Sequence, residues 1–583
     1  MNSETRNCQS CKQPFAIEPE DFQFYEKMKV PPPTWCPDCR ATRRLSFWNE
    51  HFIFKKRDAR TRKEVFSTYP EAANVKIYDH DYWWGDAWDP MQYGKEIDFS
   101  RPFLEQLKEL NEAVPWPSRS IRGMVNSDYC NQASYLKNCY LTFNANSSED
   151  CLYCIGMIGQ KNSMDVYAGV QSESCYEIYQ GGNDYQVFFS SDVEDCRNVW
   201  FSRDCNDCHD CFGCVNLRHK KYCILNVQYT KEEYEKKIQE LNFGSFESIQ
   251  TFKKKVEDLY LQLPHKYYHG VHNNDVTGDY VYESKNAKDV YEIGSSENIR
   301  YSENLGPGTK EAYDYTNWGE NVEFMYEAIS CGDGCRNLKF SFDCWPAVRD
   351  SEYCLGCHSS ADLFGCVGLR NKQYCILNRQ YSKDEYEKLR KKIIEHMSAM
   401  PYADKQGRIY KYGEFFPPEF SPLAYNETKA IDYYPKTKNE AEREGYLWRE
   451  SDPKEYESTL KADALPDHIK DVPDTITKEL IQCLVCKKTY RILDRELEFY
   501  RRFGLPLPRA CHLCRYTERV SIRNPRTLFK RVCQCLSQDM NGYKNTAEHH
   551  HGGAKCTNEF QTSYSPKRPE IIYCESCYQA EVS

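Results

Sequence analysis

The middle of the chain, from residue 127 to residue 375, repeats a short unit of polar and apolar positions. An Asn, Asp or Ser precedes a Cys, Tyr or Val, and three or four alternating residues follow, as at Asn138-Cys139 and Asp195-Cys196. The unit recurs about every ten to twelve residues, which is typical of short strands separated by polar turns. With Cys, Val, Ile and Tyr stacked inside, the pattern predicts a parallel β-helix or β-solenoid. A Greek-key sandwich would show similar turns, but not this dense self-similarity.

The middle is itself a duplication. Residues 212–236 align with residues 364–388 at an offset of 152, and 19 of the 25 positions are identical. Both copies end in a capping box, Thr230 with Glu233 and Ser382 with Glu385, in which the hydroxyl accepts from the third amide and the glutamate reaches back. We therefore expect an amphipathic helix after each run of strands. Each helix can cover an open sheet edge, which would otherwise favour aggregation.

The two ends of the chain carry matching pairs of C-x2-C motifs. The gap between the two motifs has the same length in both pairs. A two-residue spacer directs both sulfurs toward one point, and two motifs together supply four thiolates for tetrahedral Zn²⁺. The sequence therefore predicts two zinc sites, formed by Cys8, Cys11, Cys36 and Cys39 and by Cys483, Cys486, Cys511 and Cys514.

The two terminal segments match beyond their cysteines. At a constant offset of 475, the second segment repeats these residues of the first: Phe24, Tyr25, Pro31, Pro33, Arg40, Arg44 and Asn49. The pattern predicts a β-hairpin at the first motif, an amphipathic helix over residues 20–29 and a helix that opens at the second motif. On these residues each segment resembles the zinc-ribbon family of treble-clef type. The chain as a whole is similar to large multi-zinc-ribbon proteins of candidate-phylum bacteria, a resemblance that implies no particular activity.

A third cysteine-rich site follows the second zinc module. Five cysteines compete for four ligand positions there: Cys533, Cys535, Cys556, Cys574 and Cys577. The favoured set combines either Cys533 or Cys535 with the other three, because Cys574 and Cys577 form a further C-x2-C motif. The sequence therefore predicts a third Zn²⁺ near the C-terminal end.

Histidines and a comparison of the two ends bear on this third site. His549, His550 and His551 are competing ligands, although three adjacent histidines are more typical of a solvated loop. In the first segment, Asp58 lies opposite Cys533 at the offset of 475, and Asp79 lies opposite Cys574 at an offset of 495. We therefore expect this metal at the C-terminal end alone.

Composition narrows the class of protein. The chain has 583 residues, of which 31 are cysteine, and 40% are hydrophobic. This length suits roughly four domains with their own cores. No apolar run approaches the ~18 residues of a membrane span, and residues 1–10 are polar, unlike a secretory signal. Disulfide frameworks are typical of small secreted domains, so we expect a reducing cytoplasm.

The cysteines of the middle segment have two readings. In a reducing compartment we expect them to be buried as small apolar side chains. The densest run has metal-like spacing, so a further metal site is the alternative for Cys205, Cys208, Cys211 and Cys214. The counterpart run in the second half, around Cys354 and Cys357, does not keep four such cysteines, which favours packing.

Charge is segregated along the chain. The net charge is −10, yet residues 483–531 hold thirteen basic and four acidic side chains, and residues 40–63 hold nine basic and two acidic ones. Arginines on a metal-nucleated helix suit a phosphate backbone, so RNA or DNA contact is one hypothesis for Arg40, Arg44, Arg515 and Arg519. The other is that the basic modules dock internally on an acidic middle or on a protein partner.

The sequence does not indicate an enzyme. It lacks a phosphate-binding glycine loop, a dinucleotide fingerprint and a nucleophile elbow. A local group of His265, His269, His272 and Asp275 is more typical of hydrogen-bonded surface residues than of a catalytic site. The aromatic stretch over residues 78–93 suits a sugar-stacking shelf, but we expect a buried clasp between the first zinc module and the first run of strands. β-Helix enzymes that cleave polysaccharides offer only an analogy of fold.

These observations predict a mainly β protein with added helices, in which a β-solenoid middle is flanked by zinc modules. We expect a cytoplasmic scaffold that binds a macromolecular partner, most readily a protein, through a solenoid face and the basic modules. A nucleic-acid or ribosome-binding factor and a carbohydrate-active enzyme are the alternatives, and the oligomeric state stays open. The expected divisions are the following: zinc module 1–65, aromatic connection 66–126, solenoid repeat 127–229, helical insertion 230–264, second repeat 265–381, helix and linker 382–482, second zinc module 483–531 and third cysteine-rich module 532–583.

Overall fold

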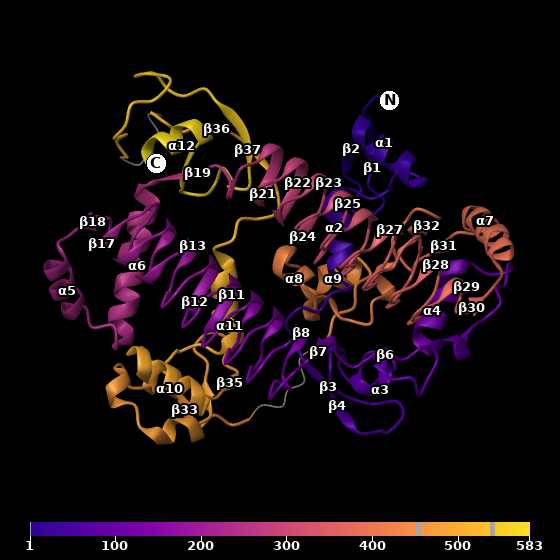
Figure 1. The fold of residues 1–583 in the computed structure, drawn as a ribbon, viewed down its shortest axis with the longest axis horizontal. Helices are drawn as coiled ribbons and strands as arrows, with labels where there is room; N and C mark the ends of the chain where they lie inside the picture. The colour runs from indigo at the N-terminus through magenta and orange to yellow at the C-terminus, as the bar shows by residue number, and fades with distance from the viewer. Residues whose placement is uncertain (1, 451–455, 537–542, 583) are drawn as a thin grey trace.

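Two stacks of short parallel strands dominate the fold, as Figure 1 shows. The structure is a computed structural model that describes residues 2–450, 456–536 and 543–582. Helices and small sheets from both ends of the chain pack around the stacks, so the architecture is mixed α/β with long parallel sheets. Of the described helices, none combines the length and the apolar character needed to cross a bilayer.

The first stack runs from Ile121 to Gln228. Its larger sheet consists of β7 (Ile121–Arg122), β8 (Asn131–Ser134), β9 (Phe143–Asn146), β10 (Ile155–Ile158), β11 (Met164–Val170), β12 (Tyr176–Gly182), β13 (Ser191–Glu194) and β15 (Arg203–Asn206). Its smaller sheet consists of β14 (Arg197–Trp200), β16 (His209–Phe212), β17 (Lys221–Ile224) and β18 (Val227–Gln228).

The second stack runs from Gly270 to Gln380. Its larger sheet consists of β20 (Gly270–Val271), β21 (Asn274–Tyr282), β22 (Lys285–Gly294), β23 (Glu297–Arg300), β24 (Glu303–Leu305), β25 (Lys310–Tyr313), β26 (Glu323–Tyr326) and β27 (Arg336–Lys339). Its smaller sheet consists of β28 (Ala361–Phe364), β29 (Gln373–Ile376) and β30 (Arg379–Gln380).

Each stack advances by a nearly constant step along the sequence. In the first stack, paired residues are 12 apart, as in Ile155 with Tyr167. Bridges outside the named strands keep the same spacing, as in Tyr140 with Leu152. In the centre of the second stack the step lengthens to 13, as in Glu297 with Lys310. The predicted parallel sheets are therefore present. Their steps of 12 and 13 residues lie at, or one residue above, the upper limit of the predicted spacing of ten to twelve residues.

A three-residue backbone period lies within each step of the first stack. Every third residue from Gln132 to Leu225 has a positive φ, the left-handed region that Asn, Asp and Gly tolerate best. A hydrophobic cluster inside the first stack is built from the next position in each triplet, since all its members from Ala133 to Cys223 directly follow a left-handed residue. Asn138 and Asp195, the polar residues before Cys139 and Cys196 in the sequence pattern, are such left-handed positions. The sequence pattern therefore shows the turn residues, but the triplet period was not predicted from it.

Helices follow each stack, as the capping boxes predict. α5 (Lys231–Glu240) and α6 (Phe246–Gln262) follow the first stack, and α7 (Lys383–Ala399) follows the second. The Thr230 hydroxyl accepts from the Glu233 amide at 3.3 Å, and the Ser382 hydroxyl accepts from the Glu385 amide at 3.4 Å. α5 packs on β17 and α7 packs on β29, the corresponding strand of the other stack. The two capping boxes are therefore confirmed.

Two cysteine modules, one from each end of the chain, have the same construction. The N-terminal cysteine module consists of the hairpin β1 (Glu4–Asn7) and β2 (Pro14–Ile17), then α1 (Pro19–Met28) and α2 (Pro37–Leu45). The C-terminal cysteine module repeats this order with β34 (Ile481–Gln482), β35 (Thr489–Tyr490), α10 (Asp494–Phe503) and α11 (His512–Ser521). The predicted hairpins and helices are present in both copies.

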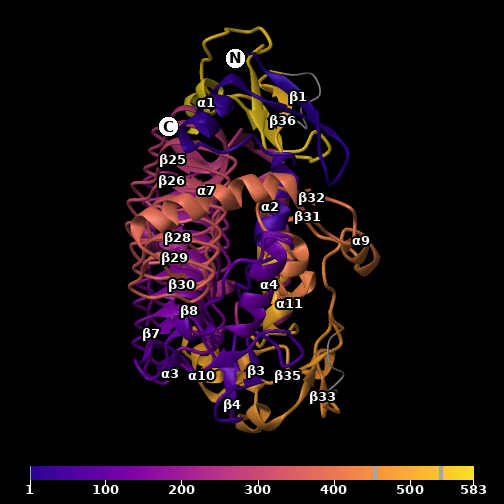
Figure 2. The same ribbon diagram turned by 90° about the vertical axis from the view of Figure 1, so that its right-hand side faces the viewer.

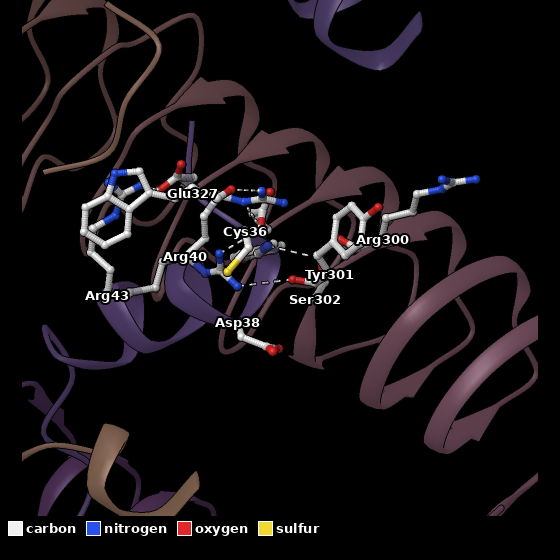
Figure 3. A network of polar contacts seen from close by, with 12 residues as sticks. Cys36, Asp38, Arg40, Arg43, Arg300, Tyr301, Ser302 and Glu327 are labelled. Carbon is white, nitrogen blue, oxygen red and sulfur yellow. Dashed lines mark hydrogen bonds and ion pairs between the residues drawn. The ribbon is translucent and has the colours of Figure 1, made fainter. Parts of the chain in front are cut away.

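The modules dock crosswise on the stacks. Arg40 Nε and Arg44 Nη1 of α2 lie 2.9 Å from Asp314 Oδ1 in the second stack. Figure 3 shows Arg40 and Arg43 of this helix among side chains of the second stack, with Glu327 and Tyr301 nearby. Arg515 Nε and Arg519 Nη2 of α11 each lie 2.8 Å from an oxygen of Asp165 in the first stack. The first module in the chain therefore holds the second stack, and the later module holds the first stack; Figures 1 and 2 show α2 and α11 against these stacks.

The two docking sites are equivalent by position. Gly213 and Gly365 correspond in the internal alignment. One step along the register leads from a residue to its partner on the preceding strand, 12 or 13 positions earlier. Four such steps lead from Gly213 to Asp165 in the first stack and from Gly365 to Asp314 in the second. The residues passed on the way are left-handed in both stacks. The paired aspartates thus occupy matching places, and the module and its docking site were duplicated together.

One further step gives a second matching contact. It leads to Tyr153 in the first stack and Tyr301 in the second. The Tyr153 hydroxyl donates to Glu496 at 2.9 Å, and the Tyr301 hydroxyl donates to Asp21 at 3.0 Å. Glu496 and Asp21 are themselves related by the offset of 475 that relates the two modules. Two independent contacts therefore repeat in both docking sites.

The remaining described segments connect these parts. β3 (Phe54–Arg57) and β4 (Glu64–Ser67) form a hairpin after the first module, and α4 (Phe103–Ala113) lies beside α7. The C-terminal segment contributes β36 (Phe529–Val532), β37 (Glu559–Thr562), β38 (Ile571–Tyr573) and α12 (Glu575–Val582). β38 pairs with β19 (Pro264–Lys266), so the end of the chain meets the connection between the two stacks.

Replacement of the docking aspartate tests this crosswise arrangement. Asp165 is 0% exposed and receives two guanidinium groups, so Asp165→Asn leaves buried charge without a partner and should lower the free energy of unfolding by about 3–5 kcal/mol. Asp150→Asn is the matched control, because Asp150 pairs with Arg495 of the same module at 3.1 Å on the surface and should cost at most about 1 kcal/mol. Chemical denaturation followed by circular dichroism measures both variants. Equal losses would show that the buried pair does not determine docking.

Candidate metal centres

The N-terminal module brings four cysteine sulfurs to one point. Cys8 and Cys11 lie in the turn of the β1–β2 hairpin, Cys36 is the N-cap of α2 and Cys39 lies in its first turn. The four sulfurs all lie within 4.8 Å of one another, and Cys11 Sγ is 3.7 Å from Cys36 Sγ. Tetrahedral zinc with Zn–S bonds of about 2.3 Å requires sulfurs roughly 3.8 Å apart. The arrangement is therefore compatible with zinc.

The C-terminal module repeats this geometry closely. The sulfurs of Cys483, Cys486, Cys511 and Cys514 also lie within 4.8 Å of one another. Cys486 Sγ is 3.7 Å from Cys511 Sγ, and the Cys511 amide donates to Cys483 Sγ at 3.3 Å. The Cys36 amide donates to Cys8 Sγ at the same 3.3 Å in the first module. The duplicated sequence thus produces duplicated centres.

Backbone hydrogen bonds prepare one of these sulfurs, that of Cys483, to act as a thiolate. Desolvation opposes ionisation of Cys483, but amides of Cys511, Cys486 and Val485 outweigh it and lower the pKa of the thiol to about 7. Hydrogen bonds to the charged form favour that form, and the thiolate is the form that binds metal. The fixed turn and helix N-terminus therefore supply a ligand set that needs little rearrangement.

A third cluster lies between the end of β36, the end of β38 and the start of α12. Its four sulfurs, from Cys533, Cys556, Cys574 and Cys577, lie within 4.8 Å of one another and are all buried. Cys556 Sγ is 3.9 Å from Cys574 Sγ, and the Cys574 amide donates to Cys533 Sγ at 3.2 Å. This set is one of the two that the sequence allowed, and it is compatible with a third zinc. Cys535 is the cysteine left outside it.

Cys535 lies beside this cluster in a set of its own. Its sulfur is grouped with ring nitrogens of His549 and His551 and with Cys577 Sγ, again within 4.8 Å. The sequence offered these histidines only as competitors, because adjacency in the chain does not show which of them turns inward. His550 is exposed, whereas its two neighbours are partly buried.

The cysteines of the middle do not gather in this way. Cys205, Cys208, Cys211 and Cys214 face the interior of the first stack and are at most 1% exposed. Among the described residues, they do not belong to any group of three or more ligands within 4.8 Å. Their thiols donate to backbone carbonyls instead, as from Cys205 to the Cys214 carbonyl at 3.6 Å.

The four arginines proposed for nucleic acid lie inside the molecule. Arg40, Arg44, Arg515 and Arg519 are 1%, 0%, 4% and 8% exposed, and all four pair with the docking aspartates described above. A phosphate backbone cannot reach side chains in this position, so the hypothesis of phosphate contact through these four residues is wrong. The geometry matches the alternative, in which the basic modules dock on the acidic stacks.

The predicted aromatic clasp forms, but against a different partner. Trp83 is 1% exposed, and its ring lies 5.5 Å from His358 of the second stack, with Arg370 stacked 5.3 Å above it. The expectation that this stretch joins the first module to the first stack is therefore incorrect. The aromatic rings face the second stack because the chain crosses to it before the first stack begins.

A cleft lies between the two stacks next to this clasp. One cavity of about 660 Å³ is lined by Trp84, Trp88 and Trp116 and by second-stack residues around Trp345. A neighbouring cavity of about 590 Å³ extends between the two stacks. Both are lined by Arg122, Asp343 and Trp345, so the two cavities are adjoining parts of one cleft.

The histidine group after α6 is dispersed. His265 Nε2 donates to the Tyr260 carbonyl at 2.8 Å, whereas His269 Nδ1 pairs with Asp279 Oδ1 at 2.8 Å. His272 and Asp275 are exposed. The four residues do not form a metal-compatible group within the described part of the chain.

No protein-family model matches this chain, and no curated protein matches it significantly. The resemblance to zinc ribbons therefore depends on the cysteine geometry and the order of elements in the two modules.

Substitution of an exposed ligand tests the terminal centres. Cys486→Ser should remove one zinc per chain and loosen α11, because three thiolates no longer close the tetrahedron. Cys175→Ala is the matched control, since Cys175 is buried in the first stack and outside every metal-compatible group. Inductively coupled plasma mass spectrometry gives the metal content, and limited proteolysis reports α11. An unchanged zinc content in Cys486→Ser would contradict the assignment.

A pH dependence follows from the His269–Asp279 pair. Burial lowers the pKa of His269, but the charge and hydrogen bond of Asp279 outweigh it and raise this pKa to about 9. The pair therefore stabilises the fold fully below about pH 6.5 and loses its effect as the pH rises through 9, an effect of the order of 3 kcal/mol. The gap in unfolding midpoint between wild type and His269→Gln should shrink between pH 6.5 and 9.5. A gap that stays constant over this range would show that the pair carries no such charge.

Proposed function

We propose that the chain is a zinc-stabilised scaffold in which two β-solenoids hold a basic polypeptide segment in the cleft between them. The observation that carries this proposal is the lining of the cleft, where exposed apolar side chains alternate with carboxylates.

Zinc is the metal that the ligand sets favour. Sets of four thiolates with sulfurs about 3.8 Å apart suit zinc or iron–sulfur centres, and C-x2-C motifs at a hairpin turn and a helix start are typical of structural zinc. Thiolate ligands require reducing conditions, which supports a cytoplasmic location. In this role the metal fixes the helices that carry the docking arginines.

A closed β-solenoid explains the stacks. A register step of 12, with a left-handed residue at every third position, supports a turn with four short sides. The members of the hydrophobic cluster that runs along the first stack, from Ala133 to Cys223, each directly follow a left-handed position. Four inward positions per step enclose a narrow interior, which favours Cys, Val, Ser and Ala over larger side chains.

The cleft has the composition of a protein-binding surface. On its walls, Ile158, Val170 and Trp318 are 52%, 44% and 41% exposed. Apolar side chains gathered at such exposure mark an interaction site more often than an ordinary surface. Stacks of repeats commonly bind extended partners in this way.

Carboxylates in the same cleft select for positive charge. Glu320 and Asp333 are exposed and lie beside Trp318, whose ring meets that of Trp345 at 6.0 Å. Asp343 lies in the same wall, but burial raises its pKa to about 7, so the exposed Glu320 and Asp333 carry more of the negative charge at neutral pH. Indole faces next to carboxylates attract Lys and Arg side chains through cation–π and charge interactions.

Nucleic acid is less well supported as the partner. The cavity between the stacks has five acidic side chains and one arginine in its lining, and a phosphate backbone would be repelled there. The arginines of the modules are internal. A basic, partly apolar polypeptide therefore fits the cleft better.

Neutralising the cleft carboxylates tests the partner chemistry. The probe is a Lys/Arg-rich amphipathic peptide, titrated by intrinsic tryptophan fluorescence. We expect the double variant Glu320→Gln/Asp333→Asn to bind at least fivefold more weakly, since each lost charge contact is worth roughly 0.5–1 kcal/mol. The double variant Glu240→Gln/Glu395→Gln carries the same charge change on exposed helix positions and should bind as wild type does.

Two outcomes would contradict the proposal. If both double variants bind the peptide equally weakly, the net charge of the protein alone would explain the loss of affinity. Tighter binding of short RNA than of the peptide, with an affinity that falls steeply between about 50 and 200 mM salt, would favour the nucleic-acid alternative instead.

A further inference from the structure

We infer that the C-terminal cluster is a binuclear zinc centre in which the Cys577 thiolate bridges two ions. This extends the metal-binding part of the proposed function by a fourth zinc. Two sets of four ligands meet there, and only Cys577 belongs to both: Cys533, Cys556, Cys574 and Cys577 form the first, and Cys535, His549, His551 and Cys577 form the second. Seven side chains thus fill eight ligand positions when one thiolate is shared.

The second set has the distances of a mixed sulfur and nitrogen site. His549 Nδ1 lies 3.4 Å from Cys535 Sγ, and His551 Nε2 lies 3.4 Å from Cys577 Sγ. With Zn–S and Zn–N bonds of about 2.3 and 2.05 Å, a tetrahedron places sulfur and nitrogen roughly 3.6 Å apart. Both contacts fit an ion at the centre of the set.

A buried carboxylate orients one of the histidines. Glu581 Oε1 lies 2.7 Å from His549 Nε2, and both side chains are at most 2% exposed. The amides of Thr546 and Ala547 also donate to Glu581. Zinc-bound histidines typically use their second nitrogen in this way, so Glu581 leaves Nδ1 of His549 directed at Cys535. A histidine in a solvated loop would need neither this carboxylate nor its burial.

Charge also favours a second ion. The five cysteines of the cluster are between 0% and 5% exposed, and four thiolates on one Zn²⁺ already leave a net charge of about −2. The Asn545 side chain donates to Cys535 Sγ at 3.0 Å, and the Asn558 side chain donates to Cys574 Sγ at 3.3 Å. Neutral donors stabilise the thiolates but do not change this net charge. A second Zn²⁺ with two neutral imidazoles brings the five thiolates close to neutrality.

The shared ligand lies where it can reach both ions. Cys577 is in the first turn of α12, three residues after Cys574. Cys535 follows β36 by three residues, on the side of the cluster that faces the histidine loop. The first set therefore lies between the two strands and the helix, the second lies between the helix and the loop, and Cys577 is at their common edge.

Metal content of the purified full-length chain tests the inference. We expect four zinc ions per chain in wild type, two from the terminal modules and two from this cluster. His549→Ala and His551→Ala should each hold three, because each removes one ligand from the second set alone. His550→Ala is the matched control and should keep four, since His550 is exposed and belongs to neither set.

Cobalt substitution tests the bridge. Two Co²⁺ ions that share a thiolate are magnetically coupled, and electron paramagnetic resonance should show this coupling in wild type and its loss in His549→Ala. Three zinc ions in wild type, or four in His549→Ala, would overturn the second site. Four cobalt ions without coupling would overturn the bridge. None of these results changes the expected outcome of the peptide-binding test of the cleft. Conversely, if four zinc ions are present but the peptide does not bind, only the proposed partner is refuted.

Discussion

The crosswise ion pairs between the cysteine modules and the stacks are the constraint on which the rest of the structure depends. Asp165 and Asp314 are each 0% exposed and each receive two guanidinium groups. An isolated buried carboxylate would be expensive, and a buried pair offsets its desolvation only with good geometry and several hydrogen bonds. Two arginines one helical turn apart, aimed at one aspartate, supply the opposite charge in both copies, while Asp314 Oδ2 has no hydrogen-bond partner within the described structure.

The helix that carries these arginines begins at a cysteine of a candidate metal centre. Cys36 is the N-cap of α2 and Cys511 is the N-cap of α11. Neither provides the hydroxyl or carboxylate that usually satisfies the first amides of a helix. A metal held by the four sulfurs would fix the start of the helix instead, and with it the rotation that places Arg40 and Arg44 on one face. In the proposed zinc-bound state, the metal would therefore orient the helix, and the helix would orient the docking arginines.

Cysteine serves two different needs in this protein, and local context separates them. In the stacks it is a small side chain that fits the interior after a left-handed residue, as Cys151 and Cys154 do. In the modules it follows a hairpin turn or opens a helix, which brings four sulfurs together. The spacing C-x2-C occurs in both settings, since a triplet period also places cysteines at every third position. Spacing alone therefore cannot identify a metal site in such a chain.

Sequence predicted the local features of this protein and missed those set by distant contacts. The two terminal ligand sets, the capping boxes at Thr230 and Ser382 and the parallel sheets all follow from short-range patterns. The burial of Arg40 and Arg515 does not, because an exposed basic helix and a docked one read alike until the partner carboxylate is known. His549 was also ambiguous, since its role depends on Glu581, which lies 32 residues away.

Each cysteine module packs on the stack that is farther from it in the sequence. Each terminal metal centre joins two motifs that are close in the sequence, whereas Arg44 reaches Asp314 across 270 residues and Arg515 reaches Asp165 across 350. Closing a longer loop costs more conformational entropy. The distant contacts therefore form more readily when the helix that carries their arginines is already ordered. The proposed zinc would supply that order locally. Because each end of the chain contacts the stack that is farther from it in sequence, the buried ion pairs join the two halves of the chain.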